Sequence, residues 1–279
     1  GSTGSVSAEI DGILFLDESA INPAAALSVA RELSAGANSE TRGYAMGGYT
    51  TALSAEIDGI QFSDESAINP AAALSMARRY IAAANSTTKG YAMGGYTTAV
   101  TAEIDGILFL DESARDLAAA LSVARLLPAG VNSTTRGYAM GGQGASDVTE
   151  IDGIQFSGIE SAINPAAALS VARHGPAGAN SETKGYAMGG NTSARVAEID
   201  GILFLDESAI DPAAALSVAR HVSAGVNSTA KGYAMGGSTG SVSAEIDGIL
   251  FLDDSAINPA AALSVARELS AGAQSGGIL

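Results

Sequence analysis

A segment of about 47 residues recurs along the whole chain and constrains its fold. The string Glu-Ile-Asp-Gly-Ile occurs six times, with spacings of 47, 47, 47, 48 and 47 residues. This period is typical of a four-stranded propeller blade and is longer than an ankyrin or tetratricopeptide unit. The repeat therefore predicts an all-β fold in which small antiparallel sheets are arranged around an axis. The six copies begin at Glu9, Glu56, Glu103, Glu150, Glu198 and Glu245.

Alternation within the repeat predicts which side chains form the core. Ile13 and Phe15 share one face of a predicted strand, and Leu14 and Leu16 share the other. The isoleucine and phenylalanine are identical in all six copies, whereas the leucine pair is replaced by glutamine and serine in copies two and four. The isoleucine face is therefore the expected core. The leucine face is expected to be partly solvated or to form a contact that varies around the ring.

Two further strands are predicted from the string GYAMGG and from the segment that follows a repeated arginine, such as residues 78–86. A fourth strand is expected around residues 64–69. Residues 22–31 allow a different interpretation, because Asn-Pro followed by AAALSVAR resembles a short capped helix.

These strands occur in an order that resembles a kelch repeat. The order is LSMARRYIAAANSTTKGYAMGG, then a variable loop, then AEIDGIQFSDES. It places an arginine before the first strand, an aromatic residue before a double glycine, and then a third strand. The chain departs from the family in having no tryptophan near the fourth strand. It is also similar to bacterial and phage-type kelch-like repeats, for which no defined activity is implied.

The arginine phase predicts the number and the bounds of the blades. We expect one domain, residues 1–279, that forms a six-bladed β-propeller of ~47-residue kelch-like repeats closed by strands from both termini. GYAMGG occurs only five times, so the alternative is five blades with a redundant or swapped terminal copy. The expected blades are 31–77, 78–124, 125–172, 173–219, 220–266, and a composite of 267–279 with 1–30.

Charge and composition limit the classes of partner that the chain can bind. The net charge of −16 disfavours nucleic acid and anionic membranes, because the summed field repels both. The chain has no cysteine, so it offers no disulfide or thiolate chemistry. It has no apolar run of ~18 residues that would span a bilayer. No compartment is indicated.

The chemistry of the side chains argues against an enzyme. The only histidines, His174 and His221, follow the repeated arginine, where other copies have glutamate, arginine or leucine. We therefore expect an exposed variable position and no catalytic residues. The acidic residues Asp58, Asp64 and Glu65 lack the spacing of a calcium loop. No metal site and no cofactor are expected.

The repeated arginines are the first candidate ligand-binding residues. By resemblance to kelch propellers they lie at the start of the innermost strand, near one mouth of the channel, where guanidinium groups can bind carboxylates or phosphates. The alternative is that each pairs with an aspartate of the Asp11 series, because a buried charge needs a partner. Two loop tyrosines, which can stack on a sugar or peptide, complete the set. The candidates are Arg31, Arg78, Arg125, Arg173, Arg220, Arg267, Tyr49 and Tyr96.

These features predict a non-enzymatic binding or structural scaffold that recognises a protein, peptide or glycan through the loop face near the arginines. The alternative is a carbohydrate-binding lectin with one small site per blade. Exposed leucine pairs would also allow self-association. The residues predicted for it are Leu14, Leu16, Leu108, Leu110, Leu203 and Leu205.

Overall fold

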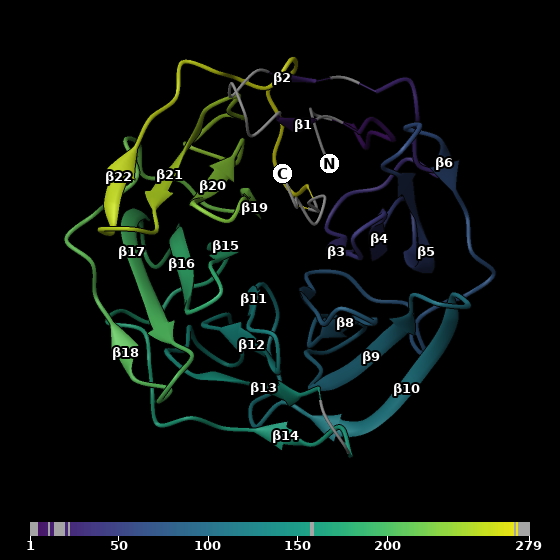
Figure 1. Cartoon of the computed structure of the whole chain (residues 1–279), viewed down its shortest axis with the longest axis horizontal. Coiled ribbons are helices and arrows are strands. Elements are labelled where there is room, and N and C mark those ends of the chain that lie inside the picture. Colours follow the sequence, from purple (N-terminus) through teal and green to yellow (C-terminus); the bar gives the residue numbers. More distant parts are fainter. Residues whose placement is uncertain are drawn as a thin grey trace.

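The chain forms a β-propeller of five four-stranded antiparallel sheets arranged around a central axis (Figure 1). The computed structural model describes residues 5–10, 12–13, 20–21, 23–156, 159–270 and 272. In every blade the first strand lies nearest the axis and the later strands lie progressively outward (Figure 1). The described part contains no helix, and so none that is long and apolar enough to cross a membrane.

The blades follow one another in chain order. Blade 1 contains β3 (Ala35–Asn38), β4 (Arg42–Tyr49), β5 (Leu53–Gln61) and β6 (Ala67–Ile68). Blade 2 contains β7 (Ala82–Asn85), β8 (Lys89–Met93), β9 (Glu103–Leu108) and β10 (Ser113–Ala120). Blade 3 contains β11 (Ala129–Asn132), β12 (Arg136–Met140), β13 (Ile151–Gln155) and β14 (Ala162–Ile163).

The last two blades have the same construction. Blade 4 contains β15 (Ala177–Asn180), β16 (Lys184–Asn191), β17 (Arg195–Leu203) and β18 (Ala209–Ile210). Blade 5 contains β19 (Ala224–Asn227), β20 (Lys231–Met235), β21 (Ile246–Leu250) and β22 (Ser255–Ile257).

The prediction of six blades is wrong. Between blade 5 and blade 1, the described residues form a two-stranded sheet of β1 (Gly12–Ile13) and β2 (Ala20–Ile21), not a sixth four-stranded sheet (Figure 1). Each four-stranded blade has one GYAMGG copy as its second strand, and neither terminal segment carries such a copy. The number of blades therefore follows the five GYAMGG strings. Most of residues 271–279, which the prediction placed in a composite blade, lie outside the described residues.

Backbone hydrogen bonds nevertheless connect the blades into a closed ring at the axis. The amide of Leu33 donates to the carbonyl of Leu269 at 2.8 Å, and the amide of Leu269 donates to the carbonyl of Val222 at 3.0 Å. The same bond joins every consecutive pair in this set, and each member has a positive φ, which turns the chain from the connection into the innermost strand. The members of this mouth ring are Leu33, Tyr80, Leu127, Gly175, Val222 and Leu269.

The core lies between neighbouring blades, and it contains the isoleucine face that the alternation predicts to be buried. Ile107 is fully buried, and its counterparts in the other blades are buried as well. A tyrosine from the second strand of one blade stacks on a phenylalanine of the next, as in Tyr44 with Phe109, whose ring centroids are 5.5 Å apart. At the axis the innermost strands approach so closely that a Cβ at Gly130 would lie 1.8 Å from the carbonyl oxygen of Ala83. Burial of these apolar faces is the main stabilising contribution.

The outermost strand is short wherever the repeat contains Asn-Pro or Asp-Pro. Proline cannot donate a hydrogen bond to the ladder, so it ends the pairing. In blade 2 the dipeptide is Asp116-Leu117, and β10 is eight residues long. The helical alternative for residues 22–31 is not observed: the described residues 23–31 form no helix, and Ala26 makes a single bridge to Glu9.

Candidate recognition face

The repeated arginines lie beneath the surface. Arg78 is fully buried, and its Nη1 donates to Asp105 Oδ2 at 2.6 Å while its Nη2 donates to the carbonyl of Ala92 at 3.0 Å. The same aspartate accepts a hydrogen bond from the amide of Ser75 at 3.0 Å. The cluster thus ties the connection that enters a blade to the second and third strands of that blade.

The other blades repeat this cluster. Each of the five blade arginines has no exposed surface and contacts the buried aspartate of its own third strand. Arg267 is 5% exposed and lies 3.4 Å from Glu9. Asp11 lies outside the described residues. The five blade arginines are therefore arranged as in the pairing alternative. Ligand binding by the six arginines stays a prediction. The buried pairs are Arg31 with Asp58, Arg78 with Asp105, Arg125 with Asp152, Arg173 with Asp200, and Arg220 with Asp247.

Two variable positions lie side by side above each cluster. The residue after the arginine and the residue after the double glycine form an antiparallel bridge. The double glycine makes this possible, because a Cβ at Gly95 would lie 2.8 Å from the carbonyl oxygen of Arg79 and its φ is +114°. The bridged pairs are Glu32 with Tyr49, Arg79 with Tyr96, Leu126 with Gln143, His174 with Asn191, and His221 with Ser238. We call these ten residues, together with the mouth ring and the loops after the second strands, the mouth face.

The Arg79 side chain is surrounded by three tyrosines at the first two blades. Its Cζ atom lies 4.7 Å from the ring centroid of Tyr49, 4.9 Å from that of Tyr80 and 5.7 Å from that of Tyr96. These are cation–π distances. The Nε atom of Arg79 is buried without a hydrogen-bond partner. The cluster joins the two predicted tyrosines to two residues that the sequence analysis did not select.

Polar side chains replace the tyrosines at blades 3 to 5. His174 Nδ1 lies 2.7 Å from Asp147 Oδ1, and its Nε2 lies 3.4 Å from the amide nitrogen of Asn191. The ring of His221 is 6.4 Å from that of His174. Burial, with smaller effects from Arg195 and His174, lowers the pKa of His221. Both histidines are half-buried, whereas the sequence predicted an exposed position. Among the described residues, no group of three histidine or acidic side chains is placed to hold a metal ion.

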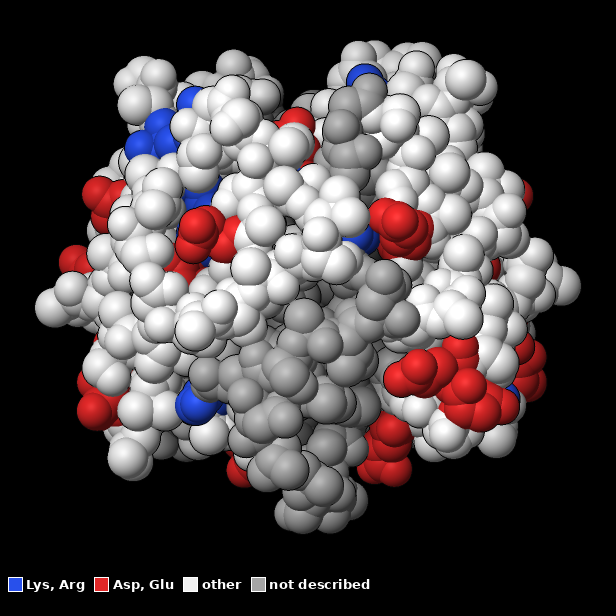
Figure 2. Space-filling model, turned by 90° about the horizontal axis from the view of Figure 1, so that it is seen from above, with Lys and Arg blue, Asp and Glu red and all other residues white. Residues whose placement is uncertain are grey.

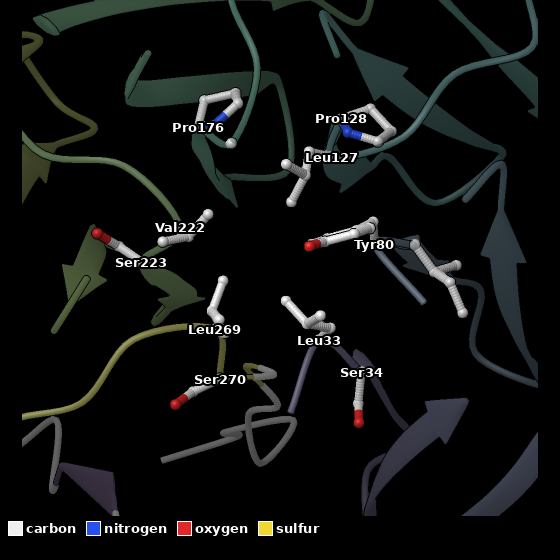
Figure 3. Close-up of a pocket in the computed structure, with 12 residues that line it drawn as sticks. Leu33, Ser34, Tyr80, Leu127, Pro128, Pro176, Val222, Ser223, Leu269 and Ser270 are labelled. Atoms are coloured by element: carbon white, nitrogen blue, oxygen red, sulfur yellow. The ribbon is translucent and has the colours of Figure 1, made fainter. Parts of the chain in front are cut away.

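A small pocket of about 90 Å³ opens at the axis. Leu33, Leu127, Val222 and Leu269 point toward its centre, and the ring of Tyr80 extends into it (Figure 3). The serines that also line it point away from the axis in Figure 3. Their hydroxyls donate to backbone carbonyls, as Ser34 does to Gly47 at 3.0 Å. The pocket is therefore lined mainly by apolar side chains.

The predicted leucines of blades 2 and 4 lie at the end of the third strand and in the turn that follows it. Leu110 and Leu205 are 91% and 95% exposed, and Leu108 and Leu203 are half-buried. Leu14 and Leu16 lie outside the described residues. Self-association through these leucines stays a prediction.

An acidic residue in the same turn joins neighbouring blades. Glu112 accepts hydrogen bonds from Arg42 at 2.9 Å and from the Tyr44 hydroxyl at 3.2 Å, both in the preceding blade. Glu160, Glu207 and Asp254 make the equivalent contacts. In Figure 2 the outer surface is mostly uncharged, with separate acidic patches and few basic side chains. Most described lysines and arginines instead form ion pairs within the propeller.

Comparison of the sequence with protein-family models and with curated proteins finds no match. The structure confirms the β-propeller fold. That its blades are kelch repeats stays a prediction. Arg79 was missed because the position after the repeated arginine was interpreted as an exposed variable one, and Tyr80, one residue further on, was not considered. The signal was present, since that position differs among near-identical copies.

Proposed function

We propose that this protein is a non-enzymatic binding scaffold that recognises a protein or peptide through the mouth face. The observation that carries the proposal is where the differences between copies lie. The buried arginine, aspartate and serine recur in every blade, whereas no two blades carry the same pair of bridged residues above them. Variable side chains on a rigid repeated support are the usual arrangement of a recognition surface.

The distribution of chemistry supports one composite site instead of equal sites on each blade. Tyrosines and an arginine lie together at blades 1 and 2, and histidines with amide and carboxylate groups lie at blades 3 to 5. A ligand that spans the mouth would contact both groups. Repeated identical subsites, as in the lectin alternative, would require the same side chains on every blade.

The geometry around His174 supports a binding role over catalysis. A histidine that activates a nucleophile bonds to a hydroxyl or thiol through one nitrogen and to an orienting acid through the other. His174 has the acid, Asp147, but its second nitrogen faces the amide of Asn191. An amide is not a nucleophile of this kind.

A selection experiment tests the proposal. Random displayed peptides and a glycan array are screened against the wild type, a mouth-face variant, Asn191→Arg, and a control on the outer turn, Leu110→Arg. Leu110 is 91% exposed, so its substitution leaves the packing intact. We expect peptide binders whose binding is lost in Asn191→Arg and kept in Leu110→Arg. Binders that respond only to Leu110→Arg, or binding to glycans alone, would contradict the proposal.

A further inference from the structure

Arg79 has no anionic partner among the described residues of this strongly acidic protein. The chain has 30 acidic and 14 basic residues, and most described lysines and arginines form ion pairs. In the described part of the chain, the guanidinium of Arg79 contacts three tyrosine rings and forms no ion pair, and its Nε has no hydrogen-bond partner. An arginine fork is well suited to a carboxylate, which it binds through two parallel hydrogen bonds.

The surroundings of Arg79 specify what the carboxylate is attached to. Tyr80 contacts the guanidinium on one side of its ring at 4.9 Å and extends into the axial pocket beside Leu33 and Leu127 (Figure 3). A ligand that fills both places carries a carboxylate and an apolar group separated by about the width of one tyrosine. Four aliphatic side chains and the Tyr80 hydroxyl point into the pocket, so it contacts an apolar group more fully than a sugar.

The whole-molecule charge limits the ligand further. A net charge of −16 repels a polyanion, so the favoured ligand carries one isolated negative charge. A peptide carboxyl terminus meets all these conditions, because its carboxylate and its last side chain are attached to the same Cα.

We propose that Arg79, with Tyr49, Tyr80 and Tyr96, binds the carboxyl terminus of a peptide whose last side chain is apolar and occupies the axial pocket. This inference rests on the proposed function and names its ligand class. Arg79 binds the carboxylate, the three rings hold the guanidinium in place, and the mouth ring accepts the side chain.

The experiment titrates the full chain with four small probes by calorimetry. They are acetyl-Gly-Leu with a free carboxylate, its carboxamide, acetyl-Gly-Gly with a free carboxylate, and glucuronate. We expect the free acid of acetyl-Gly-Leu to bind at least about tenfold more tightly than its amide, because a charge-assisted hydrogen bond is lost in the amide. Acetyl-Gly-Gly, which has no side chain for the pocket, should also bind more weakly.

Variants show whether the preference for the free acid depends on Arg79. Arg79→Gln should remove the preference for acid over amide, and Arg79→Lys should keep part of it. Arg115→Gln is the matched control, because Arg115 is paired with Glu160 on the outer part of blades 2 and 3. It should bind as the wild type does. Thermal unfolding of each variant shows whether the fold is kept, and Tyr80→Ala provides a second test should Arg79→Gln fail to fold.

Each other outcome overturns the inference. Equal binding of acid and amide, an unchanged preference in Arg79→Gln, tighter binding of glucuronate, or no binding of any probe would do so. None of these results contradicts the proposed function by itself. Displayed peptides that depend on Asn191 would still show that the mouth face is a recognition surface.

Discussion

A guanidinium that leaves water must regain its lost hydration from fixed partners. Arg125 does so with Asp152 and with the carbonyl of Ala139, which its Nη2 contacts at 2.8 Å. The aspartate in turn accepts a hydrogen bond from the amide of Ser122 at 2.6 Å. The repeated arginines and aspartates allow this pairing as one of two alternatives in the sequence. The sequence does not decide between them, because burial depends on blade packing and not on spacing along the chain.

Arg125→Leu is expected to destabilise the protein strongly. The substitution leaves Asp152 as a buried carboxylate without its cation, which costs about 3–5 kcal/mol. Urea unfolding followed by circular dichroism measures the free energy. The matched control is Arg115→Leu, because Arg115 is 40% exposed and its partner Glu160 keeps its contacts with Lys89 and Tyr91. That change should cost no more than about 1 kcal/mol. Equal losses in the two variants would contradict a structural role for the buried pair.

Tyr138 should make stability depend on pH in the alkaline range. Burial raises the pKa of Tyr138 to about 12, with Arg136 and Glu207 as further influences. The folded protein then holds the phenolic proton more tightly than the unfolded chain, whose tyrosines have a pKa of about 10. The resulting stabilisation is present below pH 10 and is lost as the pH rises toward 12.

Tyr138→Phe lacks this titration. Between pH 10 and about 12 the unfolding free energy of the wild type should therefore fall more steeply than that of the variant. Urea unfolding at intervals across this window measures both slopes. Parallel curves for the two proteins would show that Tyr138 titrates alike in the folded and unfolded states.

At the scale of strands and turns, the sequence predicted much of each blade. The strings AEIDG and GYAMGG form the third and second strands, and the segment after the arginine forms the first. The length of the fourth strand was harder to predict from the sequence. It depends on whether a proline interrupts the hydrogen-bond ladder, and β10, which has no proline there, is long. The predicted number of blades was wrong because the blades were counted from the six repeated arginines, whereas each four-stranded blade needs its own GYAMGG strand, of which there are five.

A turn residue at positive φ gives a matched pair of predictions between blades. Glu65 and Glu112 both have a φ of 55°, a region that glycine adopts without a Cβ penalty. Glu112 is bonded to Arg42 and Tyr44, whereas Glu65 is exposed. Glu65→Gly should leave stability unchanged or raise it, and Glu112→Gly should be about 1 kcal/mol less stable than Glu65→Gly. Thermal unfolding of both variants measures the difference. A larger loss in Glu65→Gly would contradict the assigned inter-blade contact.

At the scale of the whole molecule, exposed apolar side chains are distributed around the outer turns. Leu110, Leu205 and Leu252 are 88% exposed or more and belong to three different blades. We expect the wild type to self-associate reversibly, and the triple variant with serine at these positions to sediment as a monomer at the same concentration. Sedimentation velocity over a range of concentrations measures this. An identical, concentration-independent coefficient for both proteins would count against an interface at these turns.

The candidate site was predicted in part. Tyr49 and Tyr96 were selected because they lie in loops after a double glycine, and they do belong to the Arg79 cluster. Arg79 itself is one residue beyond a repeated arginine, so its role depends on which side chains the closed ring brings beside it. Such proximity between blades is a property of the assembled propeller, and spacing within one repeat does not contain it.

The mouth ring has a mechanical consequence. Every amide in it donates to the carbonyl of the preceding member of the ring, so the six peptide groups point the same way around the axis. Moving one blade outward stretches the bonds on both of its sides, and these pull on the next blades in turn. The width of the opening therefore depends on all the blades together. A group that inserts between two members of the ring on one side also changes the width on the opposite side.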